Sequence, residues 1–202
     1  MLAAGITDRL PNIPGVRDWW GTGVLHCPFC HGWEVRDEPW AYVAPAESAV
    51  ERATLFSGWA KSLTYLTNGG PRPTADQVKW LKDHQVAVRE EKIAGLDGKN
   101  GRLDTVMFDG GQPLAVRAVF VHPEPIQRSE LPKKLGCKVL TEGRQAGIVE
   151  TDAFGATSVP GVYVIGDASS TGMMNVTGAV SDGSMVGGAV QHALVKEDVE
   201  QS

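Results

Sequence analysis

The sequence lacks most of the features that mark a specialised class of protein. It contains three cysteines among 202 residues, an odd number and too few for a disulfide-paired extracellular framework. No stretch approaches the roughly 18 consecutive apolar residues that span a bilayer, and residues 1–10 lack the charged and then apolar pattern of a secretory leader. These absences predict a cytoplasmic protein that makes no membrane contact.

Positive charge is also scarce. The chain carries 19 lysines and arginines against 24 aspartates and glutamates, for a net charge of −5. Without a basic field to attract phosphates, nonspecific nucleic-acid binding is excluded. A hydrophobic content of 42% with 21% charged residues is typical of a globular protein of one domain or two small ones. Small molecules or other proteins are therefore the expected partners.

What the chain does have is a pair of thiols three positions apart, Cys27-Pro28-Phe29-Cys30. Such a pair can close into a small disulfide that reopens easily, and this spacing lowers thiol pKa values in oxidoreductases. His26 and His31 flank the pair with rings that exchange protons near neutral pH. The pattern predicts a redox dithiol with His31 as its acid–base partner, whereas His26 is interpreted as a packed or solvated neighbour.

Other interpretations of the pair stay open. Cys27-x-x-Cys30-His31 also fits the attachment motif of c-type haem, although no export signal accompanies it. A structural zinc site needs four ligands and the chain has no second cysteine pair, so no metal site is predicted. The two cysteines could also be inert. Cys137, in an apolar-flanked segment, is interpreted as a plain buried thiol.

Hydrophobic periodicity predicts an α/β fold. A strand at 41–44, a helix over 46–60 and a strand at 63–66 form a parallel βαβ unit. Thr74 and Gln77 form a capping box for a helix that ends near Lys82. Three antiparallel strands are then predicted at 86–93, 103–108 and 114–122, the first two joined by a turn at Asn100-Gly101.

A second region begins near Glu124. Residues 161–167 predict a buried strand that ends in a Gly-Asp turn. A long helix is predicted to follow, and its glycines would let it lie close to a sheet or a cofactor. One face of this helix carries apolar and small residues, namely Val176, Ala179, Val180, Gly183, Gly187, Val190 and Leu194.

Together these segments resemble the thioredoxin reductase-like flavoproteins of the pyridine nucleotide-disulfide oxidoreductase class. The matching stretches are residues 2–5 with 13–15, 27–34, 47–51, and 161–167 with 175–183. The resemblance implies a Rossmann-like nucleotide-binding domain, with a parallel sheet and an antiparallel β-meander, inserted in a partial FAD-binding domain. It implies that 1–22 are a remnant of the FAD domain, 23–123 the NAD(P)-domain-like insert with the CxxC, and 124–202 the C-terminal half of the FAD domain.

The resemblance also implies cofactor contacts. Asp167 would contact the ribityl chain of the flavin, and the start of the last helix would meet the pyrimidine edge of its ring. The alternatives are a turn aspartate and a simple helix start. The residues implied for contact with the flavin are Gly166, Asp167, Asn175, Val176 and Thr177. The residues implied at the nucleotide turn of the insert are Glu47 and Ser48, which are more simply interpreted as structural.

The chain departs from the family pattern where a nicotinamide cofactor would bind. The expected Gly-x-Gly-x-x-Ala turn falls at 44–49, which contains no glycine, and Pro45 removes an amide donor. Residues 67–70 carry none of the arginines that hold the extra phosphate of NADPH. NAD(P)H binding is therefore not expected. His31 replaces the usual aspartate and resembles a branch that includes dithiol oxidases, which pass electrons through flavin to oxygen.

These observations predict a flavin-dependent disulfide/dithiol oxidoreductase. The expected partner is a thioredoxin-like protein or a small-molecule disulfide or dithiol, and a homodimer is possible. No glycine-rich strand–turn–helix precedes Leu2, so FAD binding is expected to be incomplete. A truncated reading frame is the favoured explanation for the missing segment. The alternatives are a subunit that a second chain completes and a decayed gene copy. The alternative function is a non-enzymatic redox-sensing or protein-binding module.

Overall fold

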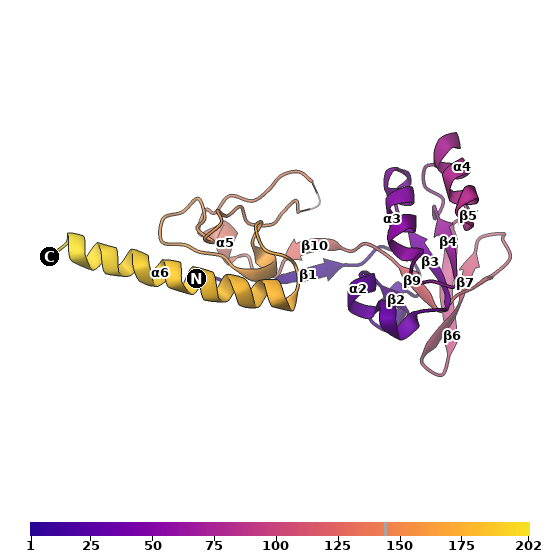
Figure 1. The fold of residues 1–202 in the computed structure, drawn as a ribbon, viewed down its shortest axis with the longest axis horizontal. Helices are drawn as coiled ribbons and strands as arrows, with labels where there is room; N and C mark the ends of the chain where they lie inside the picture. The colour runs from indigo at the N-terminus through magenta and orange to yellow at the C-terminus, as the bar shows by residue number, and fades with distance from the viewer. Residues whose placement is uncertain (144) are drawn as a thin grey trace. The chain divides into compact units, whose positions relative to one another are not determined.

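The computed structural model describes residues 1–143 and 145–202 and divides into two compact units (Figure 1). Met1–Arg9 and Glu124–Ser202 form one unit, and Leu10–Pro123 form the other. Ile13 and Val16 are buried in the core of the Leu10–Pro123 unit.

A five-stranded parallel sheet organises the Leu10–Pro123 unit. Its strands are hydrogen-bonded in the order β2 (Val24–Leu25), β9 (Ala118–Phe120), β3 (Pro39–Val43), β4 (Ser62–Leu66) and β5 (Val86–Arg89). The predicted βαβ unit is confirmed, since β3 and β4 pair in parallel through the helix between them. Parallel strands place their carboxyl ends at one edge, where the connecting loops gather.

Two helical connections link strands β3, β4 and β5. The first consists of a short 3₁₀ turn, η2 (Ala46–Ser48), and α3 (Ala49–Phe56). The second is α4 (Ala75–Asp83), whose capping box is confirmed: Gln77 N donates to Thr74 Oγ1 at 3.3 Å, and Thr74 N donates to Gln77 Oε1 at 2.8 Å. The antiparallel prediction for 86–93 is wrong, because this helix returns the chain to the same end of the sheet and makes β5 parallel to β4.

The predicted antiparallel meander is a separate three-stranded sheet, formed by β6 (Ile93–Lys99), β7 (Arg102–Phe108) and β8 (Leu114–Ala115). Asn100 and Gly101 have φ angles of 53° and 72°, as a tight hairpin turn requires, so the predicted turn is confirmed. The predicted single strand at 114–122 is wrong. Its first residues form β8, and after Arg117 N donates to Pro39 O the chain continues as parallel strand β9.

Two apolar clusters hold this unit together, one on each face of the parallel sheet. One lies between the sheet and helices α3 and α4, and its centre is a trio of rings from Trp40, Phe56 and Phe120. Their centroids lie 4.5 to 6.1 Å apart. The other cluster joins the sheet to the meander through Leu103, Val106 and their neighbours.

The other unit contains a two-stranded antiparallel sheet, β1 (Ile6–Arg9) with β10 (Glu124–Gln127). It also contains α5 (Leu131–Lys134), η3 (Gly166–Ala168) and α6 (Val176–Glu200). The prediction of a regular strand at 161–167 is wrong. Tyr163 and Val164 form only isolated bridges, because a ladder needs a neighbouring strand along its length and the described residues offer single positions, Ala156 and Leu2.

The predicted long helix is confirmed as α6, and the face that carries its apolar residues is largely exposed within its unit. Val176 is 81% exposed, Val180 68% and Leu194 52%, and Val186 is the only buried residue of the helix. Among the residues that the structure describes, no helix is long and apolar enough to cross a membrane.

Candidate functional site

The two cysteines of the dithiol motif lie at opposite ends of one helical turn. Cys27 precedes α2 (Pro28–His31), and Cys30 lies within it. Pro28 suits the first helical position, because its φ is already helical and no amide donor is needed there. Cys30 N and His31 N both donate to Cys27 O, at 3.3 and 3.2 Å. Both side chains are free thiols, and the turn brings them within hydrogen-bonding reach of each other.

The proton of the pair is held mainly on Cys30. The side-chain hydrogen bond with Cys27 raises the pKa of the Cys30 thiol to about 11, and desolvation and the charge on Cys27 add to this shift. At neutral pH Cys30 therefore stays protonated. Thiol–disulfide exchange pairs such a thiol with an attacking thiolate.

The segment after the dithiol is anchored to the core. It forms a 3₁₀ helix, η1 (Gly32–Val35), and Trp40 Nε1 donates to Val35 O at 2.7 Å inside the protein. Gly32 packs under two tryptophans, where an added Cβ would lie 3.1 Å from the Trp59 ring. The core of the unit thus fixes the position of the dithiol turn.

Two large aromatic side chains beside the dithiol are exposed to solvent in this unit. Phe29 is 74% exposed and Trp33 66%, and the Arg36 guanidinium stacks on the Trp33 ring with 3.7 Å between its central carbon and the ring centroid. His31 is half-buried at the end of α2, and among the described residues no hydrogen bond joins its ring to either thiol. Its acid–base role stays a prediction.

His26 and Cys137 have structural surroundings. The His26 ring stacks on Trp20, with centroids 5.8 Å apart. Cys137 is buried at 8% exposure, and its Sγ lies 3.6 Å from Thr157 Oγ1, which confirms the prediction of a buried thiol. Within the described part of the chain, no group of three or more His, Cys, Asp and Glu side chains could hold a metal ion.

Alkylation of Cys30 is expected to be slow although the side chain is exposed. With a thiol pKa of about 11, only about one molecule in a thousand carries the thiolate at pH 8. Its rate with iodoacetamide, followed by peptide mass spectrometry on the reduced protein, should rise about tenfold per pH unit from 7 to 10. Cys27→Ser removes the main cause of the shift and should move this rise to lower pH. A rate at Cys30 that levels off below pH 9 in the unmodified protein would contradict the assignment.

In the other unit, four of the residues implied for flavin contact share one pocket. Its volume is about 340 Å³ and it lies between η3 and the start of α6. Thr177 is exposed on α6 and does not line it. The side chain of Asn175 is engaged as the N-cap of α6 and accepts from Gly178 N at 2.7 Å. The lining residues are Ala3, Gly5, Ile165, Gly166, Asp167, Asn175, Val176 and Ala179.

The carboxyl group of Asp167 places at this pocket an oxygen atom that accepts no hydrogen bond from the described residues. Its Oδ1 atom is buried and has no hydrogen-bond partner among the described residues. Burial raises the pKa of the Asp167 carboxyl, and the nearby charge of Asp8 adds to the effect. Buried polar atoms in folded proteins almost always have partners, so this oxygen is suited to accept from a hydroxyl of a bound molecule.

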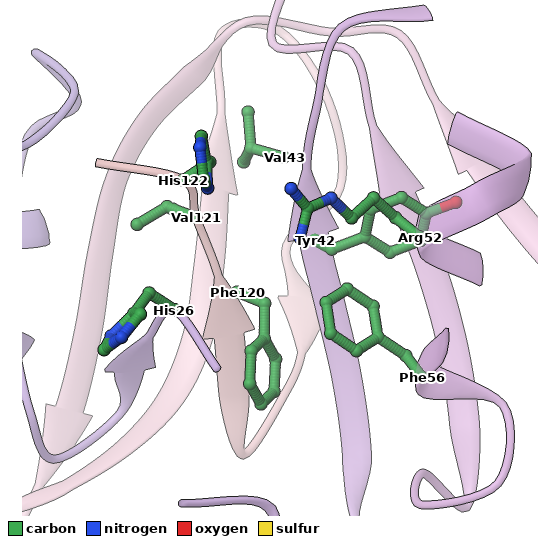
Figure 2. Close-up of a pocket in the computed structure, with 8 residues that line it drawn as sticks. All are labelled: His26, Tyr42, Val43, Arg52, Phe56, Phe120, Val121 and His122. Carbon is green, nitrogen blue, oxygen red and sulfur yellow. The ribbon is translucent and has the colours of Figure 1, made fainter. Parts of the chain in front are cut away.

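The carboxyl edge of the parallel sheet has two hollows that share Val43, Val121 and His122. The smaller, about 10 Å³, is here called the edge pocket. Its polar lining consists of His26 after β2, His122 after β9 and Arg52 on α3, and the rings of Tyr42, Phe56 and Phe120 also line it (Figure 2).

The larger hollow, about 340 Å³, is here called the proline cleft. Its lining includes Pro11, Pro45 and Pro71. Glu47 and Ser48, implied for cofactor contact, lie in η2 and line neither hollow, and Ser48 Oγ donates to Pro45 O at 3.1 Å. Sequence reasoning missed Arg52 and His122, because only the strand order brings them together.

Comparison with known proteins places this geometry in context. A family model described as "Pyridine nucleotide-disulphide oxidoreductase" matches residues 1–183. A curated relative, a probable thioredoxin reductase of Arthroderma benhamiae, is 27% identical over 99% of this chain and 55% of its own length.

Solved structures match over nearly the whole chain. The crystal structure of HlmI superposes with a TM-score of 0.86 at 36% identity, over 98% of this chain and 61% of that one. A putative thioredoxin reductase TrxB of Bacillus anthracis gives a TM-score of 0.87 at 26% identity, over 98% of this chain and 64% of that one. The chain thus spans between about half and two thirds of the length of these relatives.

Proposed function

Because the chain belongs to the pyridine nucleotide-disulphide oxidoreductase family, we propose that it is a thioredoxin reductase-like, flavin-dependent disulfide/dithiol oxidoreductase. Cys27 and Cys30 are its redox pair. The observation that carries the proposal is the hydrogen-bonded pair of free thiols on α2, in which Cys30 retains the proton. That arrangement supplies a nucleophile and a resolving thiol within one turn of helix.

The proposed exchange balances two electrons and two protons. The Cys27 thiolate attacks one sulfur of a substrate disulfide, forms a mixed disulfide and releases the other sulfur as a thiolate. Cys30 then loses its proton and attacks Cys27, which closes the Cys27–Cys30 disulfide and releases the second substrate sulfur. The substrate leaves as a dithiol or two thiols, and the reverse sequence oxidises a dithiol. His31, next to Cys30 in the chain, is the proposed acceptor and donor of these protons.

The pocket beside Asp167 fits part of a flavin cofactor. The orphaned Oδ1 of Asp167 would accept from a ribityl hydroxyl, and Gly166, Asn175 and Val176 would border the ring. Thr177 is the fifth residue that the family resemblance implies for flavin contact. Glu47 and Ser48 are the residues that it implies for cofactor contact in the NAD(P)-domain-like insert. A bound flavin would supply or accept the two electrons that the dithiol exchanges.

The proposed partner is a thioredoxin-like protein or a small-molecule disulfide or dithiol. The names of the relatives support this class, since several are thioredoxin reductases. The exposed Phe29 and Trp33 provide apolar contact area beside the dithiol for either partner. A cytoplasmic location, a homodimer and activity without a nicotinamide are part of the same proposal.

Flavin binding tests the proposal directly. FAD is titrated into the purified full chain and followed by quenching of flavin fluorescence, and the complex is then reduced anaerobically with dithiothreitol. We expect bound flavin that bleaches on reduction, and Asp167→Ala should weaken binding by about tenfold or more, since it removes a buried acceptor. A chain that forms the Cys27–Cys30 disulfide but binds no FAD would favour the redox-sensing module instead.

A further inference from the structure

We propose that the edge pocket and the proline cleft form one ligand site, which binds a small organic molecule with a single carboxylate on an apolar body. The carboxylate occupies the edge pocket, at Arg52, and the apolar body lies in the proline cleft. This inference concerns the Leu10–Pro123 unit alone and does not depend on the redox proposal.

The location of the two hollows favours a binding site. They open at the carboxyl ends of β9 and β3, where the chain order of the sheet reverses: β3 continues through α3 to β4 on one side, and β9 lies on the other. In open parallel sheets the loops on the two sides of such a point diverge and leave a crevice, and ligands bind there. The two hollows adjoin each other, since Val43, Val121 and His122 line both.

The edge pocket has the chemistry of a carboxylate site. Arg52 reaches across the strand ends from α3, with its guanidinium pointing toward Val43 and His122 (Figure 2). The side chain is half-buried, and among the described residues its guanidinium makes no hydrogen bond or ion pair. Among the residues that the structure describes, no acidic side chain lines either hollow. A guanidinium matches a carboxylate through two parallel hydrogen bonds.

The size of the hollows limits what can bind. Pockets for whole drug-sized ligands occupy about 300–1,000 Å³. At about 10 Å³ the edge pocket falls far below that range and has room for one group about the size of a water molecule or a carboxylate head, whereas the proline cleft, at about 340 Å³, holds a larger body. A ligand that fills both therefore has a compact charged end and a bulkier remainder.

The proline cleft offers few donors for phosphates. Three of its residues are prolines, which have no amide hydrogen. Its two side-chain polar groups from the β4 loop are already engaged: Thr67 Oγ1 donates to Glu90 O at 3.1 Å, and Asn68 Oδ1 accepts from Ile93 N at 2.8 Å. Pyrophosphate needs several convergent backbone amides, so the cleft favours an apolar body over a dinucleotide.

Calorimetric titration of the full chain at physiological salt tests the proposal, with 3-phenylpropionate as the probe and 3-phenylpropanol as its uncharged counterpart. We expect the acid to bind at least about tenfold more tightly than the alcohol, because a charge-assisted hydrogen bond contributes a tenfold difference or more. Equal affinities would overturn the proposal. Tighter binding of phenyl phosphate or of NADPH than of the acid would also overturn it, in favour of a phosphate site.

Variants assign the effect to Arg52. Arg52→Gln should reduce the affinity for the acid about tenfold or more, to that of the alcohol, and leave the alcohol unchanged. Arg52→Lys keeps the charge without the planar fork and should give an intermediate affinity. Arg102→Gln is the matched control, because Arg102 is an exposed arginine of the same unit whose guanidinium lies 3.6 Å from Glu38. Loss of acid binding in the control, or full affinity in Arg52→Gln, would overturn the assignment.

Discussion

Replacing Cys30 by serine is expected to stop disulfide exchange at the mixed-disulfide stage. In the reduced protein Cys27 attacks oxidised glutathione and releases one glutathione, and the second is released only when a neighbouring thiol resolves the mixed disulfide. The unmodified chain should therefore release two thiols per molecule and Cys30→Ser one. Thiol release is measured after rapid quenching, and the glutathione adduct on Cys27 is located by peptide mass spectrometry.

The third cysteine provides the matched control for this experiment. Cys137 is buried and its sulfur is near Thr157, so Cys137→Ser should still release two thiols. Cys27→Ser should yield no adduct at position 27, and any slower reaction should appear at Cys30. Release of two thiols by Cys30→Ser, or an adduct on Cys137, would contradict the proposed pair. This result is independent of whether the chain binds flavin.

Trp40→Ala is expected to have the largest effect on stability. The side chain is 1% exposed and packs on Phe56 and Phe120, and its indole nitrogen donates to the carbonyl of Val35. Removal of a buried tryptophan leaves a cavity and costs about 3–5 kcal/mol of unfolding free energy. The loss also leaves the Val35 carbonyl without its donor. Urea denaturation of the full chain, followed by circular dichroism, measures the change.

An exposed tryptophan near the same site distinguishes core packing from general loss of an aromatic residue. Trp33 is 66% exposed and contacts Arg36, so Trp33→Ala should change the unfolding free energy by less than about 1 kcal/mol. A loss of similar size in both variants would contradict the role assigned to the Trp40 cluster. Trp40→Phe keeps most of the packing but removes the indole N–H that donates to Val35 O. We expect this variant to hold η1, beside the dithiol, less firmly to the core.

Local chemistry in the sequence predicted several elements of the fold correctly. The capping box at Thr74 and Gln77 and the Asn100-Gly101 turn each depend on hydrogen bonds or φ angles within a few residues. The βαβ unit was predictable for a similar reason, because its hydrophobic periods are local. The dithiol turn belongs to the same class, since spacing alone brings Cys27 and Cys30 together.

Predictions failed where the outcome depended on distant partners. The 114–122 segment has one continuous apolar pattern, yet it divides between two sheets because Arg117 bonds to Pro39. Likewise, residues 161–167 have the composition of a buried strand but lack a neighbour to complete a ladder among the described residues. Periodicity reports which residues tend to be buried and does not report what lies beside them.

The sequence by itself determined the spacing of the two thiols at 27 and 30, the family resemblance and the absence of glycine from the turn at 44–49, because each is a matter of residue type at fixed spacing. Only the tertiary structure decided that Cys30 keeps the proton, that Asp167 holds an unused buried oxygen, and that Arg52 faces His122 across the sheet edge. Those properties arise from burial and from contacts between segments far apart in the chain, and strand order, not local pattern, creates them.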